Sequence, residues 1–277
     1  MRSTIFLSLT LGALALGACS EDSTTAPSAD AAPELAKGGK RGSVAFAHKE
    51  ADGTFQVYTM MPSGAGLKRI TSGPSSNYSP RWTPDRSKLV FVSNRDGDEH
   101  IYVMSADGSN AARLTQGTCV ERYPAPSPDG TKIAFERACG EVGIFSIKLD
   151  GTNLSRLSYG GTQPSWHPTG VYVSYAVLDV FGYYDIAGVT VGDLTPFPVV
   201  NCGIAVDCKA PAWSPEGRTA YWSSQNGGSI RLIGNGLPPA GIELARNIGP
   251  ASETAHAPTW SPDGKKVLFT ASIEGVD

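Results

Sequence analysis

Short runs rich in β-branched and aromatic residues recur along the chain, and each one follows a polar turn that contains Pro or Gly. The run at 88–92, Lys-Leu-Val-Phe-Val, follows the turn Thr83-Pro84-Asp85-Arg86. Runs of this kind, bounded by turn residues, predict β-strands because branched and aromatic side chains pack well on a pleated sheet. Corresponding runs lie at 132–135, 171–175, 219–222 and 266–269.

The turns themselves repeat, and the clearest copy is Trp260-Ser261-Pro262-Asp263-Gly264. Other copies begin at residues 82, 126, 166 and 213, which places the five copies 44, 40, 47 and 47 residues apart. An aromatic residue falls nine positions after each Trp position, and Phe46 fits the same frame in an earlier unit. These aromatic residues are Phe91, Phe135, Tyr175, Trp222 and Phe269. A period in this range indicates repeat architecture.

The unit that starts at Trp82 has room for four antiparallel strands: the Trp segment, 88–93, 101–104 and 112–115, separated by turns at 94–97 and 107–108. Four strands in about 40–45 residues are typical of a propeller blade. Six unit starts predict an all-β fold, a six-bladed β-propeller of four-stranded antiparallel blades over residues 42–277. The first unit lacks a clear first strand, and the last unit stops after its second strand, so we expect an incomplete last blade.

The recurring order Trp-Ser-Pro-Asp-Gly, Ile-Tyr-Val-Met, Asp-Gly and Arg-Leu-Thr resembles the repeats of TolB-type propellers. This resemblance covers residues 43–277 and implies the propeller fold. Proteins named TolB are soluble periplasmic partners of the Tol–Pal envelope system and carry an α/β domain before the propeller. This chain has a different N-terminal segment, so the resemblance implies the fold rather than the Tol–Pal role.

Residues 1–18 have the pattern of a signal peptide, with Arg2 followed by an apolar run from Ile5 to Leu16. The sequence Leu16-Gly17-Ala18-Cys19 resembles the lipobox of bacterial lipoproteins, which predicts a lipidated Cys19. The alternative is an ordinary signal peptide with an incidental Cys. Residues 19–41, rich in Ser, Thr, Ala and Pro, predict a flexible tether. We therefore expect a lipid-anchored protein of the bacterial cell envelope, at the outer membrane and facing the periplasm.

Composition and motifs narrow the classes of function. Charged residues make up 18% of the chain and the net charge is −3, which gives no broad cationic surface for nucleic acid. No Gly-x-Ser-x-Gly, His-Glu-x-x-His or Cys-x-x-Cys motif is present, and the four His residues are scattered. We therefore expect no catalytic residue, no metal and no cofactor. Some six-bladed relatives are lyases with channel histidines, and His256 near Glu253 is the one candidate of that kind here.

A set of polar residues lies four positions ahead of each Trp position: Tyr78, Arg122, Thr162, Lys209 and His256. In a propeller the innermost strands surround the central channel, so these positions predict a ring at one channel mouth. Tyr123 and Gln163, which follow two of them, and Glu121 lie alongside. The ring is interpreted as a binding site for an envelope protein or peptide, including an acidic one. The alternative is an ordinary wet channel rim.

The predicted function is therefore that of a monomeric module that binds a protein or ligand in the envelope and is attached to the membrane through lipid alone. One alternative is an enzyme that uses the channel, either a lyase or a glycan hydrolase. Another is a sensor or stalk domain of a longer envelope protein.

Four cysteines remain after Cys19, an even number in an exported chain. Blade topology places Cys119 and Cys139 on one face, in neighbouring connections, and Cys202 and Cys208 close one short loop. These positions predict the disulfides Cys119–Cys139 and Cys202–Cys208. The alternative is four free or metal-binding thiols.

Overall fold

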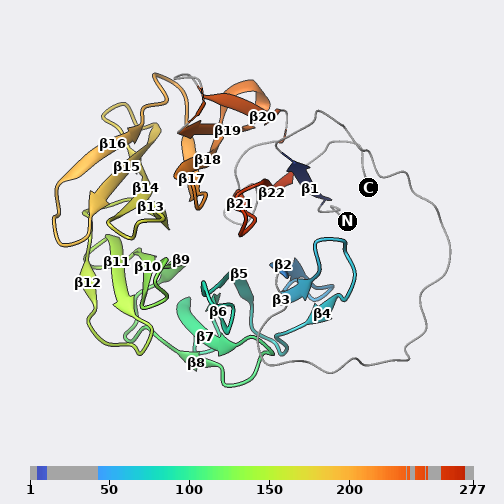
Figure 1. Cartoon of the computed structure of the whole chain (residues 1–277). Coiled ribbons are helices and arrows are strands. Elements are labelled where there is room, and N and C mark those ends of the chain that lie inside the picture. The colour runs from blue at the N-terminus through green and yellow to red at the C-terminus, as the bar shows by residue number, and fades with distance from the viewer. Residues whose placement is uncertain are drawn as a thin grey trace.

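The computed structural model describes residues 5–10, 43–234, 236–237, 241–246, 248 and 257–271. Within these residues the regular structure is β-sheet, apart from the short 3-10 helix η1 (Gln225–Gly227). The sheets are antiparallel, and they stand around a common axis with one edge of each turned toward the centre (Figure 1). The described chain is therefore an all-β propeller, as predicted.

Five sheets are built from consecutive strands, and we call them blades 1 to 5 in chain order. Blade 1 has three strands, and blades 2 to 5 have four each. Blade 1 contains β2 (Val44–Lys49), β3 (Phe55–Met60) and β4 (Lys68–Arg69). Blade 2 contains β5 (Asn77–Trp82), β6 (Lys88–Ser93), β7 (His100–Ser105) and β8 (Ala112–Arg113). Blade 3 contains β9 (Glu121–Pro126), β10 (Lys132–Arg137), β11 (Gly143–Lys148) and β12 (Ser155–Arg156). Blade 4 contains β13 (Thr162–Trp166), β14 (Tyr172–Leu178), β15 (Tyr184–Thr190) and β16 (Pro196–Val200). Blade 5 contains β17 (Cys208–Trp213), β18 (Arg218–Ser223), β19 (Ser229–Gly234) and β20 (Ile242–Arg246).

The prediction of six blades is wrong in its count. The sixth repeat contributes β21 (Thr259–Trp260) and β22 (Lys266–Ala271), and its described part ends there, so these residues supply no third or fourth strand of their own. A sheet nevertheless forms, because β1 (Ile5–Thr10) pairs antiparallel with β22. The expected incompleteness of the last unit agrees with this arrangement, as does the missing first strand of blade 1.

β1 lies within the predicted signal peptide, residues 1–18, which stays a prediction. Cys19 and the predicted tether up to residue 41 lie outside the described residues. Among the residues described, no helix has the length and apolar character needed to cross a membrane.

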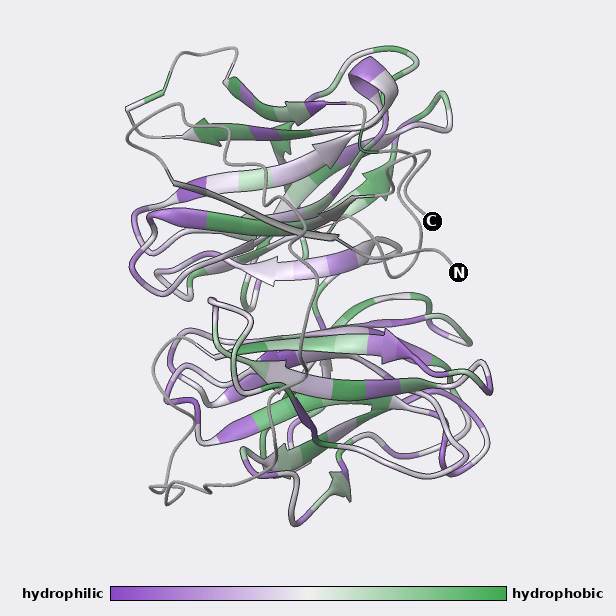
Figure 2. Ribbon diagram, turned by 90° about the vertical axis from the view of Figure 1, so that its right-hand side faces the viewer, coloured by the Kyte–Doolittle hydropathy of each residue, from purple (hydrophilic) through white to green (hydrophobic). Residues whose placement is uncertain are grey.

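Apolar side chains fill the spaces between neighbouring blades. Val90 and Val92 of blade 2 pack with Ile133 and Phe135 of blade 3, and all four are fully buried. The aromatic residue that follows each Trp position by nine residues is also buried in every repeat from the second onward. Figure 2 shows the hydrophobic segments along the strands. Aromatic side chains bury the largest areas in a core, which explains why this position is kept aromatic.

The repeated turn joins the first two strands of a blade by side-chain as well as backbone hydrogen bonds. In blade 3 the Ser127 hydroxyl donates to Asp129 Oδ1 at 2.5 Å, and the Lys132 N–H donates to Ser127 Oγ at 2.9 Å. Gly130 has φ of 70°, which glycine adopts without steric cost. The hydrogen bond from Ser127 is the main cause that holds the pKa of Asp129 below its usual value. The Ser-Pro-Asp-Gly sequence therefore closes the hairpin as predicted.

In two repeats the tryptophan before the turn bonds directly to the preceding blade. Trp166 Nε1 donates to the Ala125 carbonyl at 2.9 Å, and Trp260 Nε1 donates to the Ala212 carbonyl at 2.9 Å. Each acceptor lies on the innermost strand of the preceding blade. These bonds link inner strands whose residues are 41 and 48 positions apart.

Blades 4 and 5 use a relay instead of a direct bond. Trp213 Nε1 donates to Ser174 Oγ at 2.8 Å, and that hydroxyl donates to the Ser165 carbonyl at 3.2 Å. Trp82 differs, because its buried Nε1 has no hydrogen-bond partner in the described part of the chain. The first strand described in blade 1, β2, corresponds to the second strand of the other blades.

Candidate functional site

Four innermost strands carry the same backbone irregularity where they line the channel. In β5, β9, β13 and β17 the pairing with the next strand shifts register, which marks a β-bulge. One non-glycine residue in each bulge has positive φ: Ser79 (49°), Tyr123 (52°), Gln163 (54°) and Ala210 (53°). This conformation costs an ordinary residue roughly 1–2 kcal/mol. Strain of this kind persists where the surrounding structure imposes it, and it gathers at functional sites.

A sequence signal for the bulges exists, although the repeat pattern did not use it. Each strained residue is followed directly by proline, as in Ser79-Pro80 and Gln163-Pro164, two residues before the Trp position. Proline lacks an N–H and cannot bond to the neighbouring strand, so it belongs at a bulge or an edge. The repeated proline therefore marks the place where each inner strand leaves regular pairing.

Arg122, Thr162 and Lys209 of the predicted ring lie at the start of these bulges, and each contacts the preceding blade. Arg122 Nε forms an ion pair with Glu99 from the loop of blade 2. Tyr78 also hydrogen bonds to Glu99, and burial followed by this bond raises the pKa of the phenol. One carboxylate thus serves both a tyrosine of blade 2 and an arginine of blade 3.

Blades 4 and 5 continue the same pattern. The Thr162 hydroxyl donates to Glu136 of blade 3, and the Lys209 ammonium lies 4.1 Å from the ring centroid of Tyr184 in blade 4. Gln163 Oε1 accepts a hydrogen bond of 2.9 Å from the Ala210 N–H in blade 5. The ring therefore forms contacts from blade to blade, and each of its two described cations faces an acidic or aromatic partner.

The remaining members of the predicted site divide into two cases. Tyr123 lies next to Arg122 at a strained position, whereas His256 lies outside the described residues. Glu121 does not reach the mouth, because its side chain is fully buried between blades 2 and 3. There it accepts hydrogen bonds from Arg137 at 2.7 and 3.2 Å and lies 3.2 Å from His100 Nδ1. This buried group could not be predicted from the sequence pattern, since its members come from three different strands.

Both predicted disulfides are present. Cys119–Cys139 has a Cα–Cα distance of 5.3 Å and joins the connection before blade 3 to the loop after β10. Cys202–Cys208, with a Cα–Cα distance of 6.3 Å, closes the loop between blades 4 and 5. Both distances fall in the range for disulfides. Both bridges occupy the face that carries the connections between blades, which we call the connection face; the ring opens toward it.

The ring offers hydroxyl, amide, cationic and carboxylate groups, which suit recognition of a polar chain. Among the described residues, no group of three or more His, Cys, Asp or Glu side chains could hold a metal ion. The arrangement described here can bind and orient a partner through hydrogen bonds and ion pairs.

Comparison with solved structures shows the same fold in other proteins at low sequence identity. A putative TolB from Agrobacterium tumefaciens has a TM-score of 0.65 and 16% identity, over 83% of this chain and 90% of that one. TolB from Acinetobacter baumannii has a TM-score of 0.68 and 18% identity, over 84% of this chain but 64% of that one. An oligogalacturonate lyase in complex with manganese has a TM-score of 0.55 and 12% identity, over 84% of this chain and 86% of that one.

Comparison with curated proteins found no match. The model of the TolB beta propeller domain matches residues 10–181, which is more than half of the chain. This match spans blades 1 to 3 and the first two strands of blade 4, with three of the four inner-strand bulges described above. By this match the chain belongs to the TolB beta propeller domain family.

Proposed function

We propose that this protein is a binding module of the bacterial cell envelope, attached by lipid on Cys19 and holding an envelope protein or peptide at the ring. Family membership supports a binding role, since the related structures include proteins named TolB. The N-terminal pattern supports export and a lipid anchor at the outer membrane, facing the periplasm. The protein acts as a monomer in this proposal, without a cofactor and without nucleic acid.

One observation carries the binding role: the repetition of a strained bulge in four inner strands around one channel mouth. A single outlier could reflect local packing, but the same conformation recurs in the inner strands of blades 2 to 5, at Ser79, Tyr123, Gln163 and Ala210. Bulges change the direction of side chains and end regular pairing, and they are common beside binding sites. The surrounding structure holds these residues in the strained conformation, and this fixes the backbone of the ring.

The contacts of the two ring cations indicate how much negative charge the expected partner carries. Arg122 is paired with Glu99, and Lys209 lies over the Tyr184 ring. An acidic partner must therefore compete with existing contacts, whereas a peptide can use the amide and hydroxyl groups directly. We expect a peptide segment as the ligand, with at most one or two carboxylates that displace these contacts.

The test is crosslinking and capture from envelopes with the anchored protein, followed by comparison of variants. The double variant Arg122→Ala with Lys209→Ala should weaken capture and reduce its dependence on salt, because screening acts on exposed charge pairs. A matched control removes two exposed cations near the turns on the opposite face, Lys88→Ala with Lys266→Ala. Equal capture by the ring variant and the control across a salt series would exclude the ring as the site.

The alternatives are an enzyme that uses the channel and a sensor or stalk domain of a longer protein. Similarity to the lyase concerns the fold alone, at 12% identity. No observation among the described residues favours either alternative over binding.

A further inference from the structure

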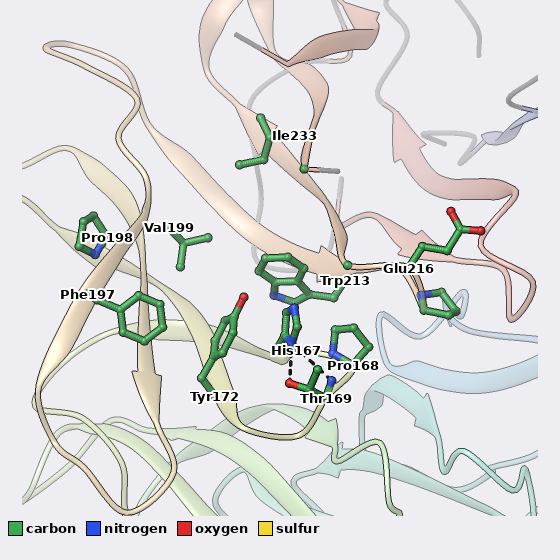
Figure 3. Close-up of a pocket in the computed structure, with 13 residues that line it drawn as sticks. His167, Pro168, Thr169, Tyr172, Phe197, Pro198, Val199, Trp213, Glu216 and Ile233 are labelled. Carbon is green, nitrogen blue, oxygen red and sulfur yellow. Dashed lines mark hydrogen bonds between the residues drawn. The ribbon is translucent and has the colours of Figure 1, made fainter. Parts of the chain in front are cut away.

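A second candidate site lies between blades 4 and 5, on the face opposite the ring. It is a cavity of about 630 Å³ lined by the repeated turns of both blades and by residues of β14, β16, β17 and β19 (Figure 3). Its lining residues come from a face that carries no residue of the predicted ring. The cavity is therefore separate from the site proposed above.

Aromatic rings form its walls. Tyr172 lies 5.2 Å from Phe197 and 5.7 Å from Trp213, measured between ring centroids, and both pairs meet edge to face. His167 stacks on Tyr172 with centroids 4.4 Å apart and meets Trp213 at 4.7 Å. Figure 3 shows these rings gathered around one space, with Pro198 and Val199 closing its outer side. The rings support one another, so the walls are rigid before any ligand arrives.

His167 belongs to this wall because it replaces the serine of the repeated turn. Its Nδ1 accepts a hydrogen bond from the Thr169 N–H at 3.3 Å and lies 2.7 Å from the Thr169 hydroxyl. It thus keeps the turn while adding a flat ring to the surface. Burial lowers the pKa of His167, so the imidazole is uncharged at neutral pH. The role of His167 could not be predicted from the sequence pattern, because the rings that it contacts, Tyr172 and Trp213, lie in β14 and in blade 5.

The Tyr172 hydroxyl is a polar group aimed into the cavity. The Tyr172 hydroxyl has no hydrogen bond within the described part of the chain, and Figure 3 shows it pointing between Val199 and Trp213. Burial raises the pKa of Tyr172 to about 12, so the hydroxyl keeps its proton and can donate. Trp213 Nε1 is already bonded to Ser174 and is not available to a ligand.

The polar groups around the cavity favour an apolar peptide over two other ligand classes. Glu216 is the one charged side chain in the lining; it pairs with Arg218 at 3.1 Å and lies apart from the rings. A cationic ligand would therefore meet aromatic faces alone, with no carboxylate beside them to pair with its charge. A sugar presents many hydroxyl groups, and the single Tyr172 hydroxyl cannot satisfy them.

We propose that this cavity binds a proline-rich peptide segment in the extended polyproline conformation. Proline rings fit against flat aromatic walls, and the segment is already ordered before it binds, so little entropy is lost. A backbone carbonyl of the peptide accepts the hydrogen bond from the Tyr172 hydroxyl. Phe197 and Trp213 form the two sides of the groove on which successive prolines rest.

The test uses a fluorescently labelled decaproline peptide and, as its counterpart, a labelled Gly-Ser peptide of the same length. Anisotropy should show binding of decaproline and not of the Gly-Ser peptide. Tyr172→Phe keeps the ring and removes the hydroxyl, so it should weaken binding by about two- to tenfold. Phe197→Ala opens one wall and should weaken binding by tenfold or more. Tyr159→Phe, an exposed tyrosine of blade 3, is the matched control and should bind like the parent protein.

Several results would overturn the proposal. These are equal binding of both peptides, unchanged binding by Tyr172→Phe and Phe197→Ala, or binding of tetramethylammonium or maltohexaose in place of decaproline. Urea unfolding of each variant identifies loss of fold, and Tyr172→Phe remains informative if Phe197→Ala unfolds. The Arg122→Ala, Lys209→Ala variant should bind decaproline normally, which separates failure at this cavity from failure at the ring.

Discussion

The interblade tryptophans permit a stability test in which two identical substitutions should have different effects. Trp166→Phe removes the indole N–H that bonds to the Ala125 carbonyl. Trp82→Phe removes an indole N–H that is buried without a partner among the described residues. Both changes remove the same part of the side chain, so much of the lost apolar burial cancels in the comparison. The remaining difference reports the hydrogen bond.

Losing a buried hydrogen bond and leaving one partner unsatisfied costs about 1–3 kcal/mol, whereas deleting an unsatisfied donor removes a penalty. We therefore expect Trp166→Phe to be less stable than Trp82→Phe by about 1–3 kcal/mol, or roughly 2–4 °C in Tm per kcal/mol for a protein of this size. Urea unfolding with an unchanged slope is the measurement. Equal midpoints, or a larger loss in Trp82→Phe, would refute the assignment of these bonds.

Three further predictions concern the anchor, the disulfide and pH. Cys19→Ala should abolish labelling by radioactive palmitate and release the protein from the membrane fraction; continued labelling would contradict lipidation at that residue. Replacing Cys119 and Cys139 by Ser should lower the free energy of unfolding by about 3 kcal/mol, as judged from urea curves of oxidised protein, and an unchanged midpoint would argue against that contribution. Hydroxyl hydrogen bonds lower the folded-state pKa values of Asp85 and Asp129 below the ordinary 3.8, so their stabilisation is present above that value and is lost as the pH falls through the folded-state values. The urea midpoint should accordingly fall between pH 5 and pH 2.5, and a midpoint that holds constant over this range would count against the effect.

The regular strands could be predicted from the sequence because the same strand pattern appears in several copies of the repeat. The run predicted at 88–93 is β6, and the run at 101–104 lies within β7 (His100–Ser105). Pairing of Cys119 with Cys139 also followed, since it depends on which connections share a face and not on side-chain detail. In each case a local pattern and the alternation of strand direction were sufficient.

The two candidate sites were harder to predict from the sequence, because their contacts join residues of different repeats. Arg122 was predicted as part of a cationic mouth, but its position relative to Glu99 depends on how blade 2 meets blade 3. His167 lies against Trp213, which is 46 residues later in the chain. The blade count was wrong because the sequence marks where a repeat begins but does not show how many strands that repeat completes.

The hydrogen bonds from the tryptophans to the preceding inner strands all run the same way around the propeller, from a donor in the later blade to an acceptor in the earlier one. Trp166 bonds to a carbonyl of blade 3, Trp213 reaches blade 4 through Ser174, and Trp260 bonds to a carbonyl of blade 5, so each of these contacts runs from a later inner strand to the one before it. The first blade is the exception, as the Trp82 Nε1 next to it, unpaired among the described residues, shows. An added interior blade that carried both the tryptophan and the inner-strand carbonyl would therefore present a donor to the blade before it and an acceptor to the blade after it.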